Sequence, residues 1–131
     1  MRTQSWRTWL ALVMLLGLIS ACGQSSLEIG MVETHLPGQW DARYTTFTGT
    51  KMDRIRAEGG ETLRLEYQAE VDKGRLDIRI EDPAGEALWE VSLQEARQDS
   101  VEVVIEEDGR YAIAIEGSDT EGSFDLSWTV E

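Results

Sequence analysis

Residues 63–71 read Leu-Arg-Leu-Glu-Tyr-Gln-Ala-Glu-Val, and every second residue of this stretch is apolar while those between are charged or carry an amide. Successive side chains of a β-strand point to opposite faces, so this period of two predicts a strand with one buried and one solvated face. Antiparallel sheets produce such alternation, whereas parallel sheets covered on both sides show continuous apolar runs. The stretch therefore predicts an antiparallel sheet with one dry face.

The same alternation recurs toward the C-terminus in segments 76–80, 87–93, 101–105, 111–115 and 124–130. Turn-forming residues or polar loops separate these segments, and Asp72-Lys73-Gly74 is short enough to predict a β-hairpin between the first two strands. One or two strands within residues 43–57 would raise the count from six to seven or eight. Two such sheets must cover each other's apolar faces, so the predicted fold is an all-β, antiparallel β-sandwich.

The first 21 residues have the three-part build of a secretory signal. Arg2 and Arg7 form a positive start, and the uncharged stretch from Trp9 to Ala21 is 13 residues long. A spanning helix needs roughly 20 apolar residues, so this segment predicts a signal helix that is cleaved from the mature protein.

The signal ends in Leu18-Ile19-Ser20-Ala21-Cys22, which resembles the lipobox of bacterial lipoproteins. The resemblance implies cleavage before Cys22 and transfer of a diacylglycerol to its thiol, with palmitate-like chains holding the protein to a membrane. The predicted organisation is a signal peptide at 1–21, the lipidated cysteine and a tether at 22–38, and a β-sandwich domain at 39–131. Gly23 is not the aspartate associated with inner-membrane retention. The expected location is the extracytoplasmic face of the outer membrane, or of the cell membrane in a cell with one membrane.

Charge and cysteine content exclude several classes of protein. The chain has 25 acidic and 12 basic residues, a net charge of −13, and Cys22 is its one cysteine. Such a surface repels nucleic acid, and no disulfide framework can form. The expected partners are the membrane, through the lipid anchor, and another extracytoplasmic protein.

Four segments, in order, resemble the bacterial pre-peptidase C-terminal domain: Asp53–Leu65, Leu76–Gly85, Gly109–Ile113 and Gly122–Leu126. They match that family's strand-and-glycine turn, its aspartate–proline–glycine turn and its two strands that begin with glycine. The match extends from about residue 50 to residue 130. The resemblance implies a jelly-roll-like sandwich outside the cytoplasm that has no catalytic activity of its own.

Catalytic residues are scarce. His35 is the one histidine, which removes Ser-His-Asp and Cys-His catalysis and the common zinc sites. The sequence therefore predicts a protein that is not an enzyme and that requires no cofactor.

Two ligand classes remain open beside a non-catalytic binding or accessory module. Calcium would suit the acidic turns, with Asp82, Glu107, Asp108 and Asp119 as candidate ligands, and a calcium- or small-ligand-binding lipoprotein is the alternative function. A carbohydrate platform would need exposed aromatic rings. Most rings of the domain fall in the apolar phase of a strand, and the exceptions are Trp40, Tyr44 and Phe47.

Overall fold

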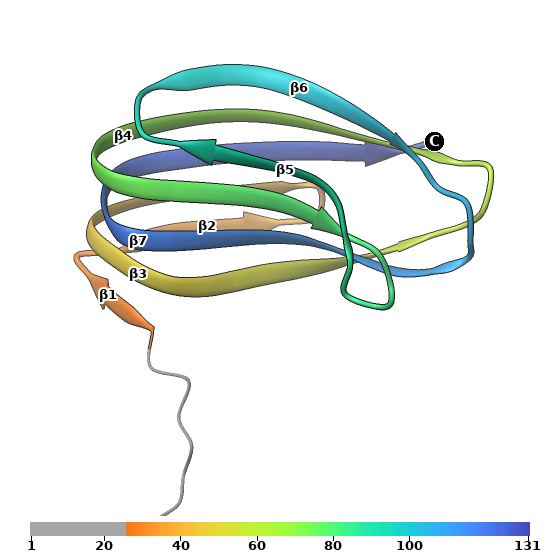
Figure 1. Cartoon of the computed structure of the whole chain (residues 1–131), viewed down its shortest axis with the longest axis horizontal. Coiled ribbons are helices and arrows are strands. Elements are labelled where there is room, and N and C mark those ends of the chain that lie inside the picture. The colour runs from red at the N-terminus through yellow and green to blue at the C-terminus, as the bar shows by residue number, and fades with distance from the viewer. Residues whose placement is uncertain (1–25) are drawn as a thin grey trace, which may run out of the picture.

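The computed structural model describes residues 26–131, and this range contains seven strands and no helix. The strands are β1 (Leu27–Ile29), β2 (Val32–Leu36), β3 (Gln39–Ala57), β4 (Thr62–Glu81), β5 (Ala87–Leu93), β6 (Arg97–Val104) and β7 (Gly109–Val130) (Figure 1). Every pairing between them is antiparallel. The predicted signal helix, the lipobox and Cys22 lie outside the described residues.

In residues 26–131 there is no helix long and apolar enough to cross a membrane.

Three strands are long enough to serve both layers of a sandwich. β3, β4 and β7 have 19, 20 and 22 residues, and each bends near its middle, with the three bends together at one end of the molecule (Figure 1). One half of each joins β2 and β6 in sheet A, in the order β2-β3-β7-β4-β6. The other halves join β5 in sheet B, in the order β3-β7-β4-β5. β1 pairs with β3 at its bend.

The connectivity is that of a jelly roll. When the halves of the three bent strands are counted separately, eight strands run from β3 to β7. The halves of β3 are strands 1 and 2, those of β4 are 3 and 4, β5 and β6 are 5 and 6, and the halves of β7 are 7 and 8. They pair in the order 1-8-3-6 in sheet A and 2-7-4-5 in sheet B. These are two interleaved Greek keys in two sheets. The predicted jelly-roll-like antiparallel sandwich is therefore confirmed.

The hairpin predicted at Asp72-Lys73-Gly74 is wrong, because the chain bends there and continues into the other sheet as β4. Residues 117–122, which the sequence predicts to be a polar loop between two strands, instead form the bend of the single strand β7. The two bends face each other, since Val71 pairs with Gly122 before them and Leu76 pairs with Gly117 after them. At each bend the buried positions change from odd to even numbers, or the reverse, which keeps the apolar side chains between the sheets.

The core lies between the two sheets and contains most of the residues that alternation predicted. Its largest fully buried side chains come mainly from both halves of the bent strands: Trp40, Phe47, Leu63, Leu65, Leu76, Ile78, Ile80, Ile105, Ile113, Ile115, Phe124 and Leu126. Ala87 is exposed and Trp128 is partly buried, although both are in the apolar phase. Residues 27–36, which the sequence placed in the tether, form the two short strands that pair with β3.

Candidate functional site

Two candidate calcium ligands, Asp82 and Glu107, line one hollow of about 520 Å³ at the end of the sandwich opposite the bends. Asp82 Oδ1 accepts hydrogen bonds from the backbone N–H groups of Ala84 and Glu86, both at 2.9 Å. These are the bonds by which an aspartate closes its own turn. Asp82 therefore has a structural role that needs no ion.

The other two candidates lie apart from this hollow and from each other, Asp108 in the loop between β6 and β7 and Asp119 in the bend of β7. Asp108 Oδ1 accepts from the backbone N–H of Gly59 at 2.7 Å, and Asp119 Oδ1 accepts from the Thr48 hydroxyl at 3.2 Å. Within residues 26–131, no three side chains of the metal-ligating types come together in a group that could hold an ion. The fold thus joins each of these two aspartates to a neighbouring segment.

The aromatic residues of unresolved phase do not form a platform. Trp40, Tyr44 and Phe47 are 1%, 5% and 0% exposed, and Trp40 packs edge-on against Phe124 with ring centroids 5.4 Å apart. In the part of the chain that the structure describes, every tryptophan, tyrosine and phenylalanine is buried or partly buried. Trp40, Tyr44 and Phe47 therefore offer no flat aromatic surface for stacking sugar rings.

The solvent-facing side of sheet A carries a regular array of polar side chains. Cross-strand partners in an antiparallel sheet lie on the same face, so the register fixes which residues are neighbours. One row contains Ser100, Glu66 and Ser127, and the next contains Gln98, Gln68 and Asp125. Small or short side chains occupy β7 in these rows, while longer ones rise from β4.

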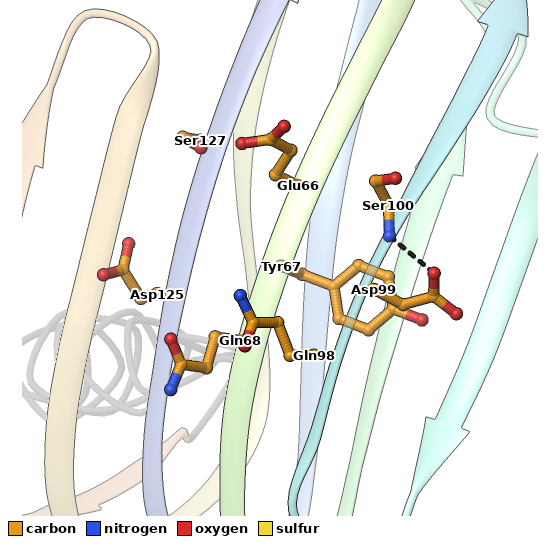
Figure 2. A pocket seen from close by; sticks show the side chains of 8 residues that line it. All are labelled: Glu66, Tyr67, Gln68, Gln98, Asp99, Ser100, Asp125 and Ser127. Carbon is orange, nitrogen blue, oxygen red and sulfur yellow. Dashed lines mark hydrogen bonds between the residues drawn. The ribbon is translucent and has the colours of Figure 1, made fainter.

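Two adjoining hollows follow this array. One has a volume of about 400 Å³ and is lined by residues of β4, β6 and β7, namely Glu66, Tyr67, Gln68, Gln98, Asp99, Ser100, Asp125 and Ser127 (Figure 2). The second, of about 680 Å³, shares Glu66 and Ser127 with it and continues toward Arg64, Trp128 and Thr129. We call the two hollows together the outer groove.

Most polar groups of the first hollow are free to bind a ligand. Among the eight residues drawn in Figure 2, the hydrogen bond that is formed runs from the Ser100 backbone N–H to Asp99 Oδ1, at 2.8 Å. The Gln68 and Gln98 amides and the Asp125 carboxylate do not bond to one another. Amides donate and accept hydrogen bonds while carboxylates accept them, so the first hollow offers both kinds of partner.

The charges of the outer groove are unevenly balanced. Asp125 lies directly opposite Asp41 of β3, and like charges in this position are destabilising. Glu66 is 3.4 Å from Arg64, which also reaches Glu102 at 3.5 Å. The half of the groove near Asp125 is therefore acidic. The half near Arg64 is acidic as well, because Arg64 is the one cation among the described residues that line it, against Glu66, Glu102 and Glu131.

At the rim of the groove, Asp99 stays ionised in mildly acidic solution. The backbone N–H of Ser100 and the guanidinium of Arg97 lower the pKa of its carboxyl group. Burial raises the pKa of Tyr67, whose ring packs between the sheets against Trp89. The polar lining of the groove thus consists mainly of carboxylates, amides and hydroxyls.

Sequence reasoning did not identify the outer groove. Most of its residues belong to predicted solvated strand faces or to the predicted polar loop before residue 101, and alternation alone does not distinguish a binding face from an inert one. A usable signal is the run Ser123, Asp125, Ser127 and Thr129, in which every outward residue of a central strand is short and polar.

No family model matches the chain, and no curated protein does. The resemblance to the pre-peptidase C-terminal domain therefore stays a prediction.

Solved structures share the fold of this chain. TmCBM61 in complex with β-1,4-galactotriose superposes with a TM-score of 0.56 at 12% identity, covering 90% of this chain and 92% of that one. The enzymatically active domain of bacteriophage CBA120 tailspike protein 4 gives a TM-score of 0.51 at 14% identity, covering 82% of this chain and 19% of that one. At these identities the likeness is one of fold, and this chain has the jelly-roll-like β-sandwich of those structures.

Proposed function

We propose that this chain is a lipid-anchored, extracytoplasmic protein whose β-sandwich is a non-catalytic binding module for neutral glycans. The observation that carries the proposal is the outer groove, in which amides, carboxylates and hydroxyls line two adjoining hollows on the outer face of sheet A. The lipobox at Cys22 supports the anchor. The fold supports a binding module, since TmCBM61, which shares it, is in complex with a galactose trisaccharide.

Hydroxyl groups suit the groove's residues. A sugar hydroxyl donates to a carboxylate such as Asp125 and accepts from an amide such as Gln68, and hydrogen bonds to charged groups contribute about 1.5–3 kcal/mol each. The acidic groove would repel uronic acids and sulfated sugars. A neutral oligosaccharide is therefore the ligand that fits.

The glycan proposal is tested by measuring binding of the chain and of two groove variants to a panel of neutral oligosaccharides by calorimetry. We expect Gln68→Ala and Asp125→Ala each to weaken binding about tenfold, because each loses a hydrogen bond to the ligand. Gln94→Ala is the matched control, since Gln94 is exposed in the turn between β5 and β6. Failure of the unmodified chain to bind any neutral glycan, or equal binding by the groove variants, would refute the proposal.

The anchor is tested separately. Cells expressing the chain are labelled with radioactive palmitate, and membrane and soluble fractions are compared for the unmodified protein and Cys22→Ser. We expect the label and the membrane association to be lost in Cys22→Ser and kept in the control Ser25→Ala, whose hydroxyl lies outside the lipobox. A Cys22→Ser protein that remains labelled and membrane-bound would show that the cysteine is not the anchor.

A further inference from the structure

The edge formed by β1 and β2 turns its polar side chains toward the protein and its aliphatic side chains toward solvent, which is the reverse of the rest of the sandwich. β1 and β2 both pair with the same edge of β3. Glu28 is opposite the buried Phe47, Glu33 is opposite the buried Ala42, and His35 is opposite the buried Trp40. The polar residues of this edge therefore point toward the protein.

Each inward polar side chain has a partner on β3. Lys51 Nζ lies 3.0 Å from Glu28 Oε1 and 2.7 Å from Glu33 Oε2. The Trp40 indole N–H donates to Glu33 Oε1 at 2.6 Å. The edge is therefore held in a defined orientation by polar contacts.

His35 adds two contacts to this set. Its ring stacks on Trp40 with centroids 5.0 Å apart, and its Nε2 lies 3.0 Å from Asp53 Oδ2. The edge therefore cannot turn its other face inward without breaking contacts at three inward positions.

Four of the five outward positions of the same edge are aliphatic, and the fifth is Thr34. Leu27, Ile29, Val32 and Leu36 are 52%, 50%, 72% and 52% exposed. They alternate with the three inward polar residues, so their exposure follows from the register rather than from fraying. We call these four residues the apolar edge.

We infer that the apolar edge is a lipid-contacting surface, which lies against the boundary between the headgroups and the acyl chains of the membrane that holds the anchor. The inference rests on the proposed anchoring at Cys22. Leu27 is five residues from that cysteine, and an extended chain spans at most about 3.6 Å per residue. The apolar edge therefore begins within about 18 Å of the lipid, and aliphatic side chains beside an interface are favourably removed from water.

Local charge permits this contact although the chain as a whole is acidic. The outward cross-strand neighbours of the apolar edge include Arg43, opposite Val32, and Asp41, opposite Thr34. These two charges balance each other, and the next carboxylate in the row of Asp41 is that of Asp125 on β7, two strands away from the apolar edge. A second copy is a poorer occupant, because pairing two edges would bring together two chains with a net charge of −13 each. A lipid surface without net charge carries no such cost.

The test places an environment-sensitive fluorophore on the edge of the full, lipidated chain. Val32→Cys and the matched control Val104→Cys, at valines that are 72% and 66% exposed, are labelled and reconstituted into phosphatidylcholine vesicles with or without doxyl-labelled acyl chains. Val104 ends β6, away from the bend at which β1 lies (Figure 1). We expect doxyl lipid to reduce the emission at position 32 at least about twofold and to leave that at position 104 unchanged.

Vesicle flotation separates the possible outcomes. Protein that floats with its vesicles but is not quenched at position 32 retains the anchor and overturns the lipid contact. Protein that does not float overturns the anchor, and the lipid contact with it. Emission at position 32 that shifts to the blue with rising protein concentration before vesicles are added would assign the edge to a second copy and overturn the inference.

Discussion

Replacing Gly122 by alanine tests whether the paired bends determine the fold. Gly122 lies where β7 passes from one sheet to the other, with a φ of 143°, and a Cβ atom there would collide with the backbone carbonyl of Glu70 on β4. The unfavourable backbone conformation costs an L-residue about 1–2 kcal/mol. The collision is with main chain and cannot be relieved by a rotamer change, so the pairing of Val71 with Gly122 must open.

Loss of one or two ladder hydrogen bonds adds about 1–2 kcal/mol, so we expect Gly122→Ala to lower the free energy of unfolding by about 3 kcal/mol. Gly85→Ala is the control, because Gly85 has a φ of 87° but a Cβ atom added to it would meet no atom within 4 Å. Gly85→Ala should lower the free energy of unfolding only by the cost of the unfavourable backbone conformation, about 1–2 kcal/mol. Urea unfolding of the mature chain measures both variants, and equal losses would refute the argument that the bend requires close backbone contact.

Three other outcomes are expected from the core, the edge and the acidic turns. Phe124→Ala should cost about 3–5 kcal/mol, and Trp128→Ala should cost less because Trp128 is partly buried; thermal unfolding that ranks them in the opposite order would contradict the observed packing. Burial raises the pKa of Glu33, but hydrogen bonds from Lys51 and Trp40 outweigh it and the net shift is downward from 4.5. The contribution of Glu33 is therefore complete above about pH 4.5 and lost as the pH falls through its folded pKa. In urea unfolding, Glu33→Gln should destabilise the chain most at about pH 7, and its effect should shrink as the pH falls below about 4.5. Calcium at about 1 mM should leave the midpoint of thermal unfolding unchanged relative to chelator, whereas a raised midpoint would restore the acidic turns as a calcium site.

The strands could be predicted from the sequence. That β3, β4 and β7 each bend and belong to both sheets could not be predicted. Alternation at 63–71 and at 76–80 places two buried faces correctly, and the change from odd to even positions marks a break between them. A hairpin and a bend produce the same break, because both contain short polar residues and glycine. Whether the chain forms a hairpin or a bend depends on its pairing with β7, which bends at the same place as β4 and lies more than 40 residues away in the sequence.

The sequence also could not predict that the apolar face of β1 points toward solvent. Leu27-Glu28-Ile29 alternates, and the usual expectation would place its aliphatic residues inside. Here the core position opposite β1 is already filled by Phe47, and Lys51 offers a partner to the acidic side chains instead. Long-range ion pairing has therefore reversed a local preference.

The burial of Trp40, Tyr44 and Phe47 changes what kind of recognition the module can perform. Without these three rings to stack on, a bound sugar gains mainly hydrogen bonds that replace those made by water, and each neutral bond contributes only about 0.5–1.5 kcal/mol. About four or five such bonds, less the free-energy cost of association, leave a dissociation constant of about 1 mM or higher. An affinity this low is of little use to a protein that diffuses freely, but many copies held on one surface bind a polymeric glycan at high effective concentration. The proposed anchor and the proposed groove therefore depend on each other: the weaker the single site is, the more its function requires that Cys22 fix it to a membrane.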